Sequence, residues 1–402
     1  MDKGDLDDLL LSMLNAFPSN VSDLICSANK PLQVEHSGVL YDVGYQPALA
    51  FSYLSPFQTA HVSLTLMSNS DRLMHDYLHT GSCDLAYQVR DIVRFRANIF
   101  STKKNFSVVL RKLETKVPSL LDLKSPAIFK QIINEKNGLV LVTGSTGSGK
   151  STTLAAMLRE INESKSYHIV TLEDPIEFTH QNLSATFNQR ELGADFDTFP
   201  HGLKAALRQA PKIILVGELR DRETMEIALT AAETGHLVMS TLHTVNAGQT
   251  INRIVGMFEK EQEEQIRTRL ADTLRWIVCQ RLVKTKDGAR VAAHEIMGNN
   301  LRTVEIILNG EDEIKTYFNA IESSEVLGWQ SFESCLLKLY SQGLVSEDEI
   351  LFNSTRKNVM RQKIDYVKNM KGEKTTDLEK VQIDNNYTTR MREKLKSGEP
   401  II

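Results

Sequence analysis

Residues 144–151 read GSTGSGKS and so place three glycines, a lysine and several hydroxyl side chains in eight consecutive positions. The stretch fits the pattern G-x-x-x-x-G-K-[ST], whose backbone N–H groups bind phosphates. An apolar run typical of a buried parallel strand, GLVLVTG at 138–144, precedes it, and a helical pattern over 151–162 follows it. Strand, glycine-rich loop and helix in this order predict a phosphate-binding site, because free N–H groups at the start of a helix favour an anion.

The side chains of this loop predict a nucleotide with a metal ion as the ligand. Lys150 can bridge the outer phosphates, and the hydroxyl group of Ser151 can ligate Mg²⁺. We therefore expect the chain to bind ATP and Mg²⁺. The predicted nucleotide-binding residues of the loop are Gly144, Ser145, Thr146, Gly147, Ser148, Gly149, Lys150, Ser151 and Thr152.

Polar residues also stand at the ends of two later apolar runs. Glu218 follows KIILVG at 212–217, and His243 ends HLVMSTLH at 236–243. The carboxyl ends of parallel strands meet at one edge of a sheet, which is the edge where a phosphate loop begins. We therefore expect Glu218 to orient or deprotonate the attacking water and His243 to sense the γ-phosphate.

A cluster of acids follows another expected strand, in TLEDPIEF at 171–178. The cluster contains Glu173, Asp174 and Glu177, and any one of them can hold Mg²⁺ directly or through water. The alternative is a proline turn with solvated acids.

The remaining pattern predicts an α/β protein of two domains. From about residue 127, apolar strands alternate with helical patterns, which predicts a doubly wound parallel sheet, and the chain after about residue 256 is expected to be mostly helical. Before that, the alternation in VRFRANIF at 93–100 predicts a strand with one apolar and one basic face, and residues 5–17 predict an amphipathic helix. The predicted division is an N-terminal domain over 1–113, a linker over 114–126, an ATPase domain with C-terminal helices over 127–370 and a polar, mobile tail over 371–402.

Composition narrows the class of protein. The 402 residues are 41% hydrophobic and 24% charged with a formal net charge of −4, as in a soluble globular protein. This balance argues against nucleic acid as a partner and against a helicase. Four scattered cysteines argue against a zinc site or a disulfide framework. Without an apolar run of membrane-spanning length or a signal peptide, we expect a cytoplasmic protein that meets a membrane only through a partner.

Several motifs together resemble one protein family. GSTGSGKSTTLAAM, TLEDPIEF, ALRQAPKIILVGELRD and VAAHEIM resemble the secretion ATPase superfamily of type II and type IV systems. Within it, the sequence is most similar to the twitching-motility, or pilus-retraction, ATPases, from Val21 to about residue 350. The resemblance implies a PAS-like N-terminal domain, a RecA-like ATPase domain and a homohexamer with nucleotide between the two domains. It also implies recruitment to the inner membrane by the platform protein of a pilus or secretion machine.

The resemblance also assigns residues. Positions that match the acidic box, the catalytic glutamate and the histidine box are Glu173, Glu177, Glu218, His236 and His243. Glu177 is then expected to act in catalysis and to hold Mg²⁺ through water. Arg96 and Arg111 fall in segments that resemble the strands whose arginines complete the site, with Arg94 as the alternative.

Two features bear on the subfamily. Pilus-assembly and type II secretion ATPases usually carry a tetracysteine zinc module and a long N-terminal extension, and this sequence has neither, which favours the retraction group. That group typically has a motif like AIRNLIRE after EIM, where this chain has GNNLRTVEIILNG at 298–310 and keeps Arg302. A secretion or conjugation ATPase of the type IVB kind, an accessory retraction ATPase and a regulatory nucleotide-binding protein are therefore the alternatives to a retraction motor.

Overall fold

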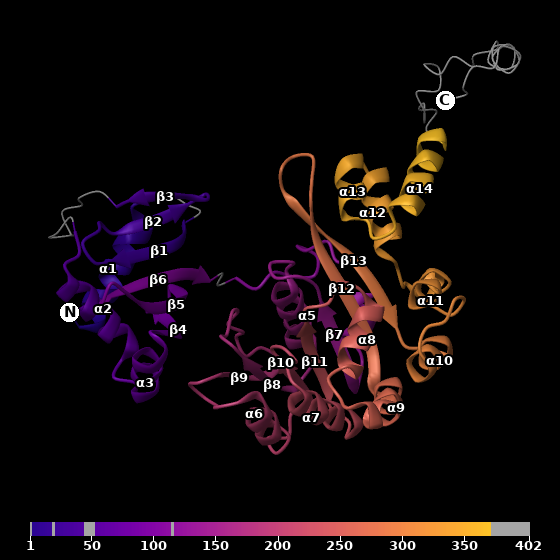
Figure 1. Cartoon of the computed structure of the whole chain (residues 1–402), viewed down its shortest axis with the longest axis horizontal. Helices are drawn as coiled ribbons and strands as arrows, with labels where there is room; N and C mark the ends of the chain where they lie inside the picture. The colour runs from indigo at the N-terminus through magenta and orange to yellow at the C-terminus, as the bar shows by residue number, and fades with distance from the viewer. Residues whose placement is uncertain (1, 18–20, 44–52, 114–115, 371–402) are drawn as a thin grey trace, which may run out of the picture. The chain divides into compact units, whose positions relative to one another are not determined.

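The computed structural model describes residues 2–17, 21–43, 53–113 and 116–370. Two compact units are distinguished, Met1–Leu282 with Ala292–Ser331 and Val283–Val291 with Phe332–Ile402. The first unit contains two separate sheets, whose strands are labelled in Figure 1. Both sheets are accompanied by helices, and this confirms the predicted α/β class. The domain boundaries at residues 113 and 126 stay predictions.

The sheet nearer the N-terminus is antiparallel and has six strands in the order β3-β2-β1-β6-β5-β4. Its strands are β1 (Val21–Ser27), β2 (Gln33–His36), β3 (Val39–Asp42), β4 (Ser82–Val89), β5 (Val93–Thr102) and β6 (Asn105–Leu113). Along β5, Val93, Phe95, Ala97 and Ile99 are buried and the residues between them are not, as the sequence alternation predicts.

Three helices pack with this sheet, namely α1 (Lys3–Asn15), α2 (Pro56–Met67) and α3 (Asp71–Thr80). The first helix begins at Asp2, whose side chain forms a capping box with Asp5. Leu6, Leu10 and Met13 of α1 are fully buried in the same hydrophobic core as the strands. The helix predicted at 5–17 is therefore confirmed, and its apolar side packs on its own domain.

The second sheet has seven strands in the order β13-β12-β7-β11-β10-β8-β9. Six of them pair in parallel, from β12 across to β9. The strands are β7 (Gly138–Thr143), β8 (His168–Glu173), β9 (Thr186–Glu191), β10 (Ile213–Val216), β11 (Leu237–Leu242), β12 (Leu274–Lys284) and β13 (Arg290–Gly298). All residues of β7, β10 and β11 are buried, as in a sheet with both faces covered.

Helices between these strands supply the crossovers that parallel pairing requires. They are α5 (Lys150–Ser164), α6 (Phe199–Ala206), α7 (Arg222–Glu233), α8 (Ala247–Val255), η1 (Lys260–Gln262) and α9 (Glu263–Thr273), whereas α4 (Phe129–Ile132) precedes β7. After β13 come α10 (Leu301–Asn309), α11 (Tyr317–Glu322) and η2 (Glu325–Leu327). The strands and helices predicted between residues 138 and 243 are all present.

As expected, the described part of the chain after residue 256 is mostly helical. Two strands were not expected there, β12 and β13, of 11 and 9 residues, which extend the sheet beside β7. Five consecutive residues of β12, Trp276 to Gln280, are buried, so the strand lacks the period-two alternation that would have revealed it. The helix before β7, α4 (Phe129–Ile132), has only four residues.

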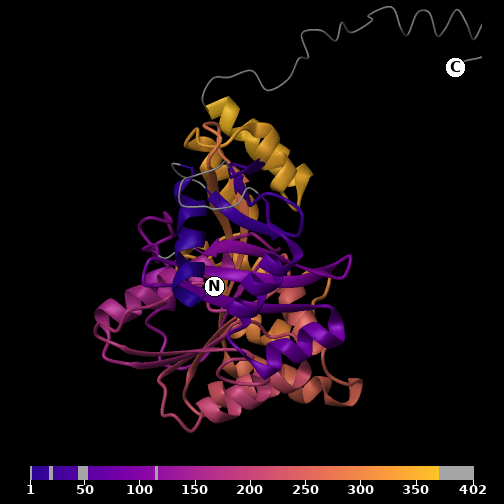
Figure 2. The same cartoon turned by 90° about the vertical axis from the view of Figure 1, so that its left-hand side faces the viewer.

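The second unit combines the turn between β12 and β13 with three helices, α12 (Phe332–Ser341), α13 (Glu347–Asn353) and α14 (Lys357–Met370) (Figures 1 and 2). The backbone N–H of Lys286 in the turn donates to the carbonyl oxygen of Leu344 at 3.0 Å. Glu333 of α12 is 1% exposed and accepts the backbone N–H of Arg356 at 2.8 Å. The predicted tail over 371–402 lies outside the described residues.

Candidate nucleotide site

The phosphate loop connects the end of β7 to the start of α5. Its backbone passes through positive φ at Gly144 (+151°), Gly147 (+77°) and Gly149 (+87°), a region that residues with a side chain rarely adopt. A Cβ atom on Gly144 would in addition lie 2.4 Å from the carbonyl oxygen of Gln280. The loop therefore needs glycine, and its path into a helix N-terminus fits the phosphates of a nucleotide.

Lys150 is the first residue of α5 and is only 9% exposed. Its Nζ donates to the carbonyl oxygens of Gly144 and Ser145, at 3.0 Å each, so the ammonium group lies across the loop. Burial lowers the pKa of Lys150, and the negative charges of Glu177 and Glu218 oppose that change. The structure thus brings the predicted lysine and two of the predicted carboxylates together.

Glu218 lies two residues beyond β10, with its side chain 13% exposed. The register of β10 with β11 aligns Val216 with Ser240, so both strands end at the same edge of the sheet. His243 follows β11, and its Nε2 lies 3.6 Å from Oε2 of Glu218. The predicted pair of carboxylate and imidazole is therefore assembled at the edge where the phosphate loop begins.

Arg220 is a site residue that the sequence analysis missed. Its guanidinium group forms an ion pair with the Glu218 carboxylate, while its side chain is 72% exposed. The sequence offered one signal, because side chains two residues apart in an extended segment share a side of the backbone. Glu218 consequently has a cationic partner within its own loop.

Glu173 ends β8, and its carboxylate is enclosed by polar neighbours. Thr171 Oγ1 donates to Glu173 Oε1 at 2.6 Å, and Gln189 Nε2 donates to the same atom at 3.1 Å. Burial, with a smaller contribution from the charge of Glu177, raises the pKa of Glu173 to about 7, although these two hydrogen bonds work in the opposite direction. This carboxyl group therefore titrates close to neutral pH.

Strand β9 adds two polar residues to the acidic segment. Gln189 accepts the N–H of His180 and donates to the carbonyl oxygen of Phe178, both at 2.8 Å. Glu191 Oε2 accepts the N–H of Ile176 at 3.2 Å. The sequence analysis missed both residues, because the strand TFNQRE has few apolar residues and gives no strand signal.

His236 lies apart from the other predicted residues within the chain. It precedes β11, whose first residue pairs with Gly138 at the start of β7. The six residues of β11 separate it from His243, a span of about 20 Å. Its Nδ1 lies 3.0 Å from the carbonyl oxygen of Ala231, so His236 belongs to the opposite edge of the sheet.

Two of the candidate arginines are bound to acids near their own strands. Arg96 and Arg111 stand opposite each other on β5 and β6. Arg111 Nε donates to Asp23 at 2.9 Å, and Arg96 Nε lies 3.9 Å from Asp84. Their side chains are 70% and 49% exposed, so both present part of their guanidinium groups to solvent.

Arg94 differs from these two, because its partner belongs to the parallel sheet. Its Nη2 donates to Glu191 Oε2 at 2.6 Å, and the two side chains are 20% and 13% exposed. The same oxygen atom accepts the N–H of Ile176. Arg94 is therefore connected through Glu191 to the backbone of the acidic segment.

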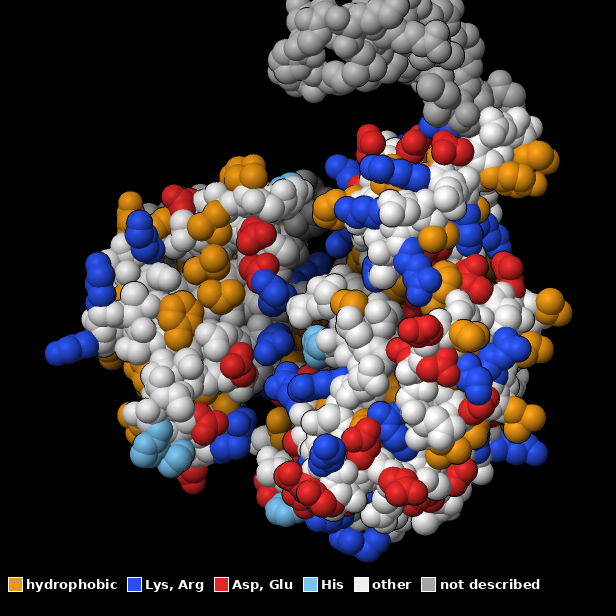
Figure 3. Space-filling view, turned by 45° about the vertical axis from the view of Figure 1, so that its right-hand side comes forward, with side chains coloured by type: hydrophobic (Ala, Val, Ile, Leu, Met, Phe, Trp, Pro, Cys, Tyr) orange, Lys and Arg blue, Asp and Glu red, His pale blue; other side chains and the backbone are white. Residues whose placement is uncertain are grey.

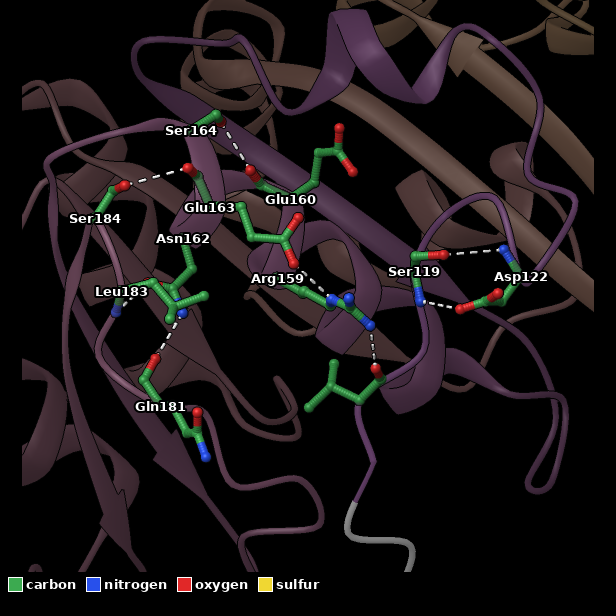
Figure 4. Close-up of polar contacts among 11 residues, drawn as sticks. Ser119, Asp122, Arg159, Glu160, Asn162, Glu163, Ser164, Gln181, Leu183 and Ser184 are labelled. Atoms are coloured by element: carbon green, nitrogen blue, oxygen red, sulfur yellow. Dashed lines mark hydrogen bonds and ion pairs between the residues drawn. The ribbon is translucent and has the colours of Figure 1, made fainter.

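The far end of α5 is tied to two other segments (Figure 4). Arg159 Nη1 donates to the carbonyl oxygen of Val117 at 2.7 Å, within the segment that the sequence predicts as a linker. Asn162 Nδ2 donates to the carbonyl oxygen of Gln181 at 2.7 Å, beyond the acidic segment. Helix α5 therefore begins at the phosphate loop, and its C-terminal end contacts both the predicted linker and the segment that follows the acidic cluster.

Within the described ranges, no three His, Cys, Asp or Glu side chains form a group able to hold a metal ion. None of the helices that the structure describes has the length and hydropathy of a membrane span. Basic and acidic side chains are interspersed on the face shown in Figure 3, in line with 47 Lys and Arg against 51 Asp and Glu.

Comparison with known proteins places this chain among secretion and pilus ATPases. The family "Type II/IV secretion system protein" matches residues 57–382. The type IV pilus retraction ATPase PilT of Pseudomonas aeruginosa is 40% identical over 328 residues, which cover 81% of this chain and 92% of that protein. PilU, the type IV pilus ATPase of the same organism, is 39% identical over 342 residues, covering 85% of this chain and 87% of PilU.

Solved structures show the same relationship. The crystal structure of the pilus retraction motor PilT with bound ADP has a TM-score of 0.78 and 36% identity, and the match covers 89% of this chain and 98% of that one. The ATPase DotB of Legionella pneumophila has a TM-score of 0.76 and 28% identity, covering 88% of this chain and 95% of DotB.

Proposed function

Because the chain belongs to the type II/IV secretion system protein family, we propose that it is a homohexameric ATPase that drives retraction of type IV pili. The observation that carries this proposal is the similarity to PilT over nearly the whole of both chains, at 40% identity in sequence and a TM-score of 0.78 in structure. The intact set of catalytic side chains supports turnover rather than binding alone, since a protein that only binds nucleotide does not need Glu218 and His243 beside the loop.

The loop residues account for nucleotide binding. Backbone N–H groups between Gly144 and Ser151 surround the phosphates, and Lys150 supplies the positive charge that the outer phosphates require. To reach the phosphates, Lys150 would break its hydrogen bonds to the carbonyl oxygens of Gly144 and Ser145. The Ser151 hydroxyl, and Glu177 through water, would hold Mg²⁺, which would supply further charge neutralisation on the phosphates.

Glu218 is assigned as the group that activates water. Its carboxylate takes a proton from the water as the water oxygen attacks the γ-phosphorus, and the bond to the leaving ADP oxygen breaks. The nearby His243 can donate to Glu218 or to a γ-phosphate oxygen, which suits the predicted sensor role. Arg220 pairs with Oε1 of the same carboxylate, which leaves Oε2, on the side of His243, to accept a hydrogen bond from water.

The ring is proposed to complete the site and to transmit the work. Arg96 and Arg111 are partly exposed on the outer face of the N-terminal sheet, where a neighbouring subunit's nucleotide would find them. Arginines contribute transition-state charge stabilisation in other phosphoryl-transfer enzymes. The output partner is proposed to be the inner-membrane platform protein of the pilus, which recruits the cytoplasmic ring to the membrane.

A second candidate function is export by a secretion or conjugation machine. It is supported by the description of the family that matches residues 57–382, "Type II/IV secretion system protein", which names secretion and not retraction. The chain also departs from the retraction group over residues 298–310, which keep Arg302 and lose most of the rest of the motif. An accessory retraction ATPase is supported by the similarity to PilU.

Deletion of the gene, with pili counted on the cell surface, tests the proposal. Loss of a retraction motor leaves as many pili or more and abolishes twitching. Complementation with Glu218→Gln, which keeps the fold and lacks the base, should fail to restore twitching. Cells without pili, or cells with normal pili, normal twitching and failed export of proteins or DNA, would overturn the retraction assignment in favour of assembly or secretion.

A further inference from the structure

Gln280 is a buried polar residue outside the phosphate-loop motif. It lies on β12, next to β7, and is 3% exposed. Its Nε2 donates to the carbonyl oxygen of Ser148 at 2.7 Å, and its Oε1 accepts the hydroxyl of Thr153 at 2.7 Å. One amide group therefore holds the loop with its donor side and the first turns of α5 with its acceptor side.

We propose that Gln280 is a positioning residue for the nucleotide, acting through the backbone of the phosphate loop. Ser148 precedes Gly149, whose positive φ turns the chain into α5 and aims the following N–H groups. A hydrogen bond on the Ser148 carbonyl fixes the peptide plane that carries the N–H of Gly149. The orientation of that donor, and of Lys150 after it, then depends on Gln280.

Two other atoms of Gln280 also lie close to the backbone of the phosphate loop. The backbone carbonyl oxygen of Gln280 limits position 144 to glycine, and its Nε2 would lie 2.8 Å from a Cβ on Gly149. Two of the three glycines of the loop, Gly144 and Gly149, thus face the same residue of β12. The positions of Gly144 and Gly149 are matched to Gln280 and not only to the ligand.

This role explains why a polar side chain occupies a buried strand position. Neighbouring strand residues such as Val278 and Ile277 are apolar and fully buried, as packing alone requires. An amide in the same environment costs free energy unless its hydrogen bonds are made. Here both sides of the amide are used, and both partners belong to the nucleotide-binding loop and its helix.

The test measures binding of a fluorescent ADP analogue and steady-state ATP hydrolysis on the full chain. Gln280→Leu removes both hydrogen bonds at similar volume, and Thr153→Val removes only the one to Thr153. Thr273→Val is the matched control, because Thr273 is 3% exposed, donates to the carbonyl oxygen of Arg269 at 2.7 Å and is the last residue of α9, directly before β12 and at the end of that strand away from Gln280. Melting temperatures without nucleotide are recorded for all three variants.

We expect Gln280→Leu to raise the Kd for the ADP analogue and the KM for ATP by about tenfold, the loss typical of a buried hydrogen bond. Thr153→Val should show a smaller loss that Thr153→Ser largely recovers. Thr273→Val should lower the melting temperature and leave Kd unchanged. These readouts concern nucleotide binding alone, so they do not depend on whether the motor retracts pili.

The proposal is overturned if Gln280→Leu lowers the melting temperature but binds the ADP analogue within twofold of the wild type. It is also overturned if Thr273→Val weakens binding as much as the other two variants, since the effect would then be general destabilisation. Should Gln280→Leu not fold, Thr153→Val and Thr153→Ser decide the question by the same comparison.

Discussion

Replacing Glu173 by glutamine should stabilise the protein at alkaline pH and bring no gain in acid. Burial holds the pKa of Glu173 at about 7 in the folded chain, against an ordinary value of 4.5. Below pH 4.5 the group is protonated in both states, so it exerts no penalty. Between pH 4.5 and 7 the unfolded chain ionises first, and stability falls as pH rises through the folded pKa.

The magnitude follows from that difference of about 2.5 pH units, at about 1.4 kcal/mol for each, which gives a penalty of about 3 kcal/mol above pH 7. Glutamine is neutral at every pH and therefore carries no such penalty. Thr171 and Gln189 can still donate to the amide oxygen, but the backbone N–H of Glu177 also bonds to the carboxylate and would face an NH₂ group in one orientation. The net gain at pH 8 should therefore be about 2 kcal/mol.

Scanning calorimetry of wild type and Glu173→Gln at pH 4.5 and pH 8 measures this effect. A gain of about 2 kcal/mol corresponds to a rise in melting temperature of about 5 °C at pH 8, with none at pH 4.5. Glu160→Gln, on the flank of α5, is the control and should change neither value. Equal melting temperatures of wild type and Glu173→Gln at pH 8, or a lower one for the variant, would show that Glu173 is ionised in the folded chain without cost.

Three further substitutions test the assigned chemistry. Lys150→Ala should abolish nucleotide binding or hydrolysis, because it removes the one ammonium group that the described residues place across the loop, and equilibrium dialysis with ADP measures the binding. Glu218→Gln should bind ATP normally and lose at least a hundredfold in kcat, since an amide cannot take a proton; turnover at the wild-type rate would remove Glu218 as the base. Arg94→Ala should reduce kcat more than ADP affinity, because it frees Glu191 from its partner; Glu191→Gln should have the same effect, and a double variant no worse than either single one would show that the two act together.

The local sequence pattern was sufficient to predict which residues lie at the carboxyl edge of the parallel sheet. GSTGSGKS specifies its own backbone path, because only glycine adopts the φ values at 144, 147 and 149. The strand before the loop and the helix after it have strong periodic signals. Glu218 and His243 could be located because parallel strands end at a common edge, so order along the chain predicts proximity.

Tertiary structure decided which polar residues serve that edge from elsewhere in the chain. β9 and β12 carry Gln189, Glu191 and Gln280, yet neither strand has a period-two apolar pattern, since one lies at the sheet's edge and the other is buried on both faces. Their contacts join residues up to 132 positions apart, as between Gln280 and Ser148, and no local signal encodes such pairs.

The histidines and arginines show the same division. His236 and His243 have equal standing in a motif, but the length of β11 puts them at opposite ends of a strand. Arg94 and Arg96 lie on the same face of β5. Only the fold reveals that Arg94 contacts Glu191 while Arg96 lies near Asp84. The sequence by itself determined which groups are available and which loop binds phosphate, because these depend on neighbours along the chain. The fold alone decided which groups pair, because pairing depends on strand order and register, which neighbours along the chain do not specify.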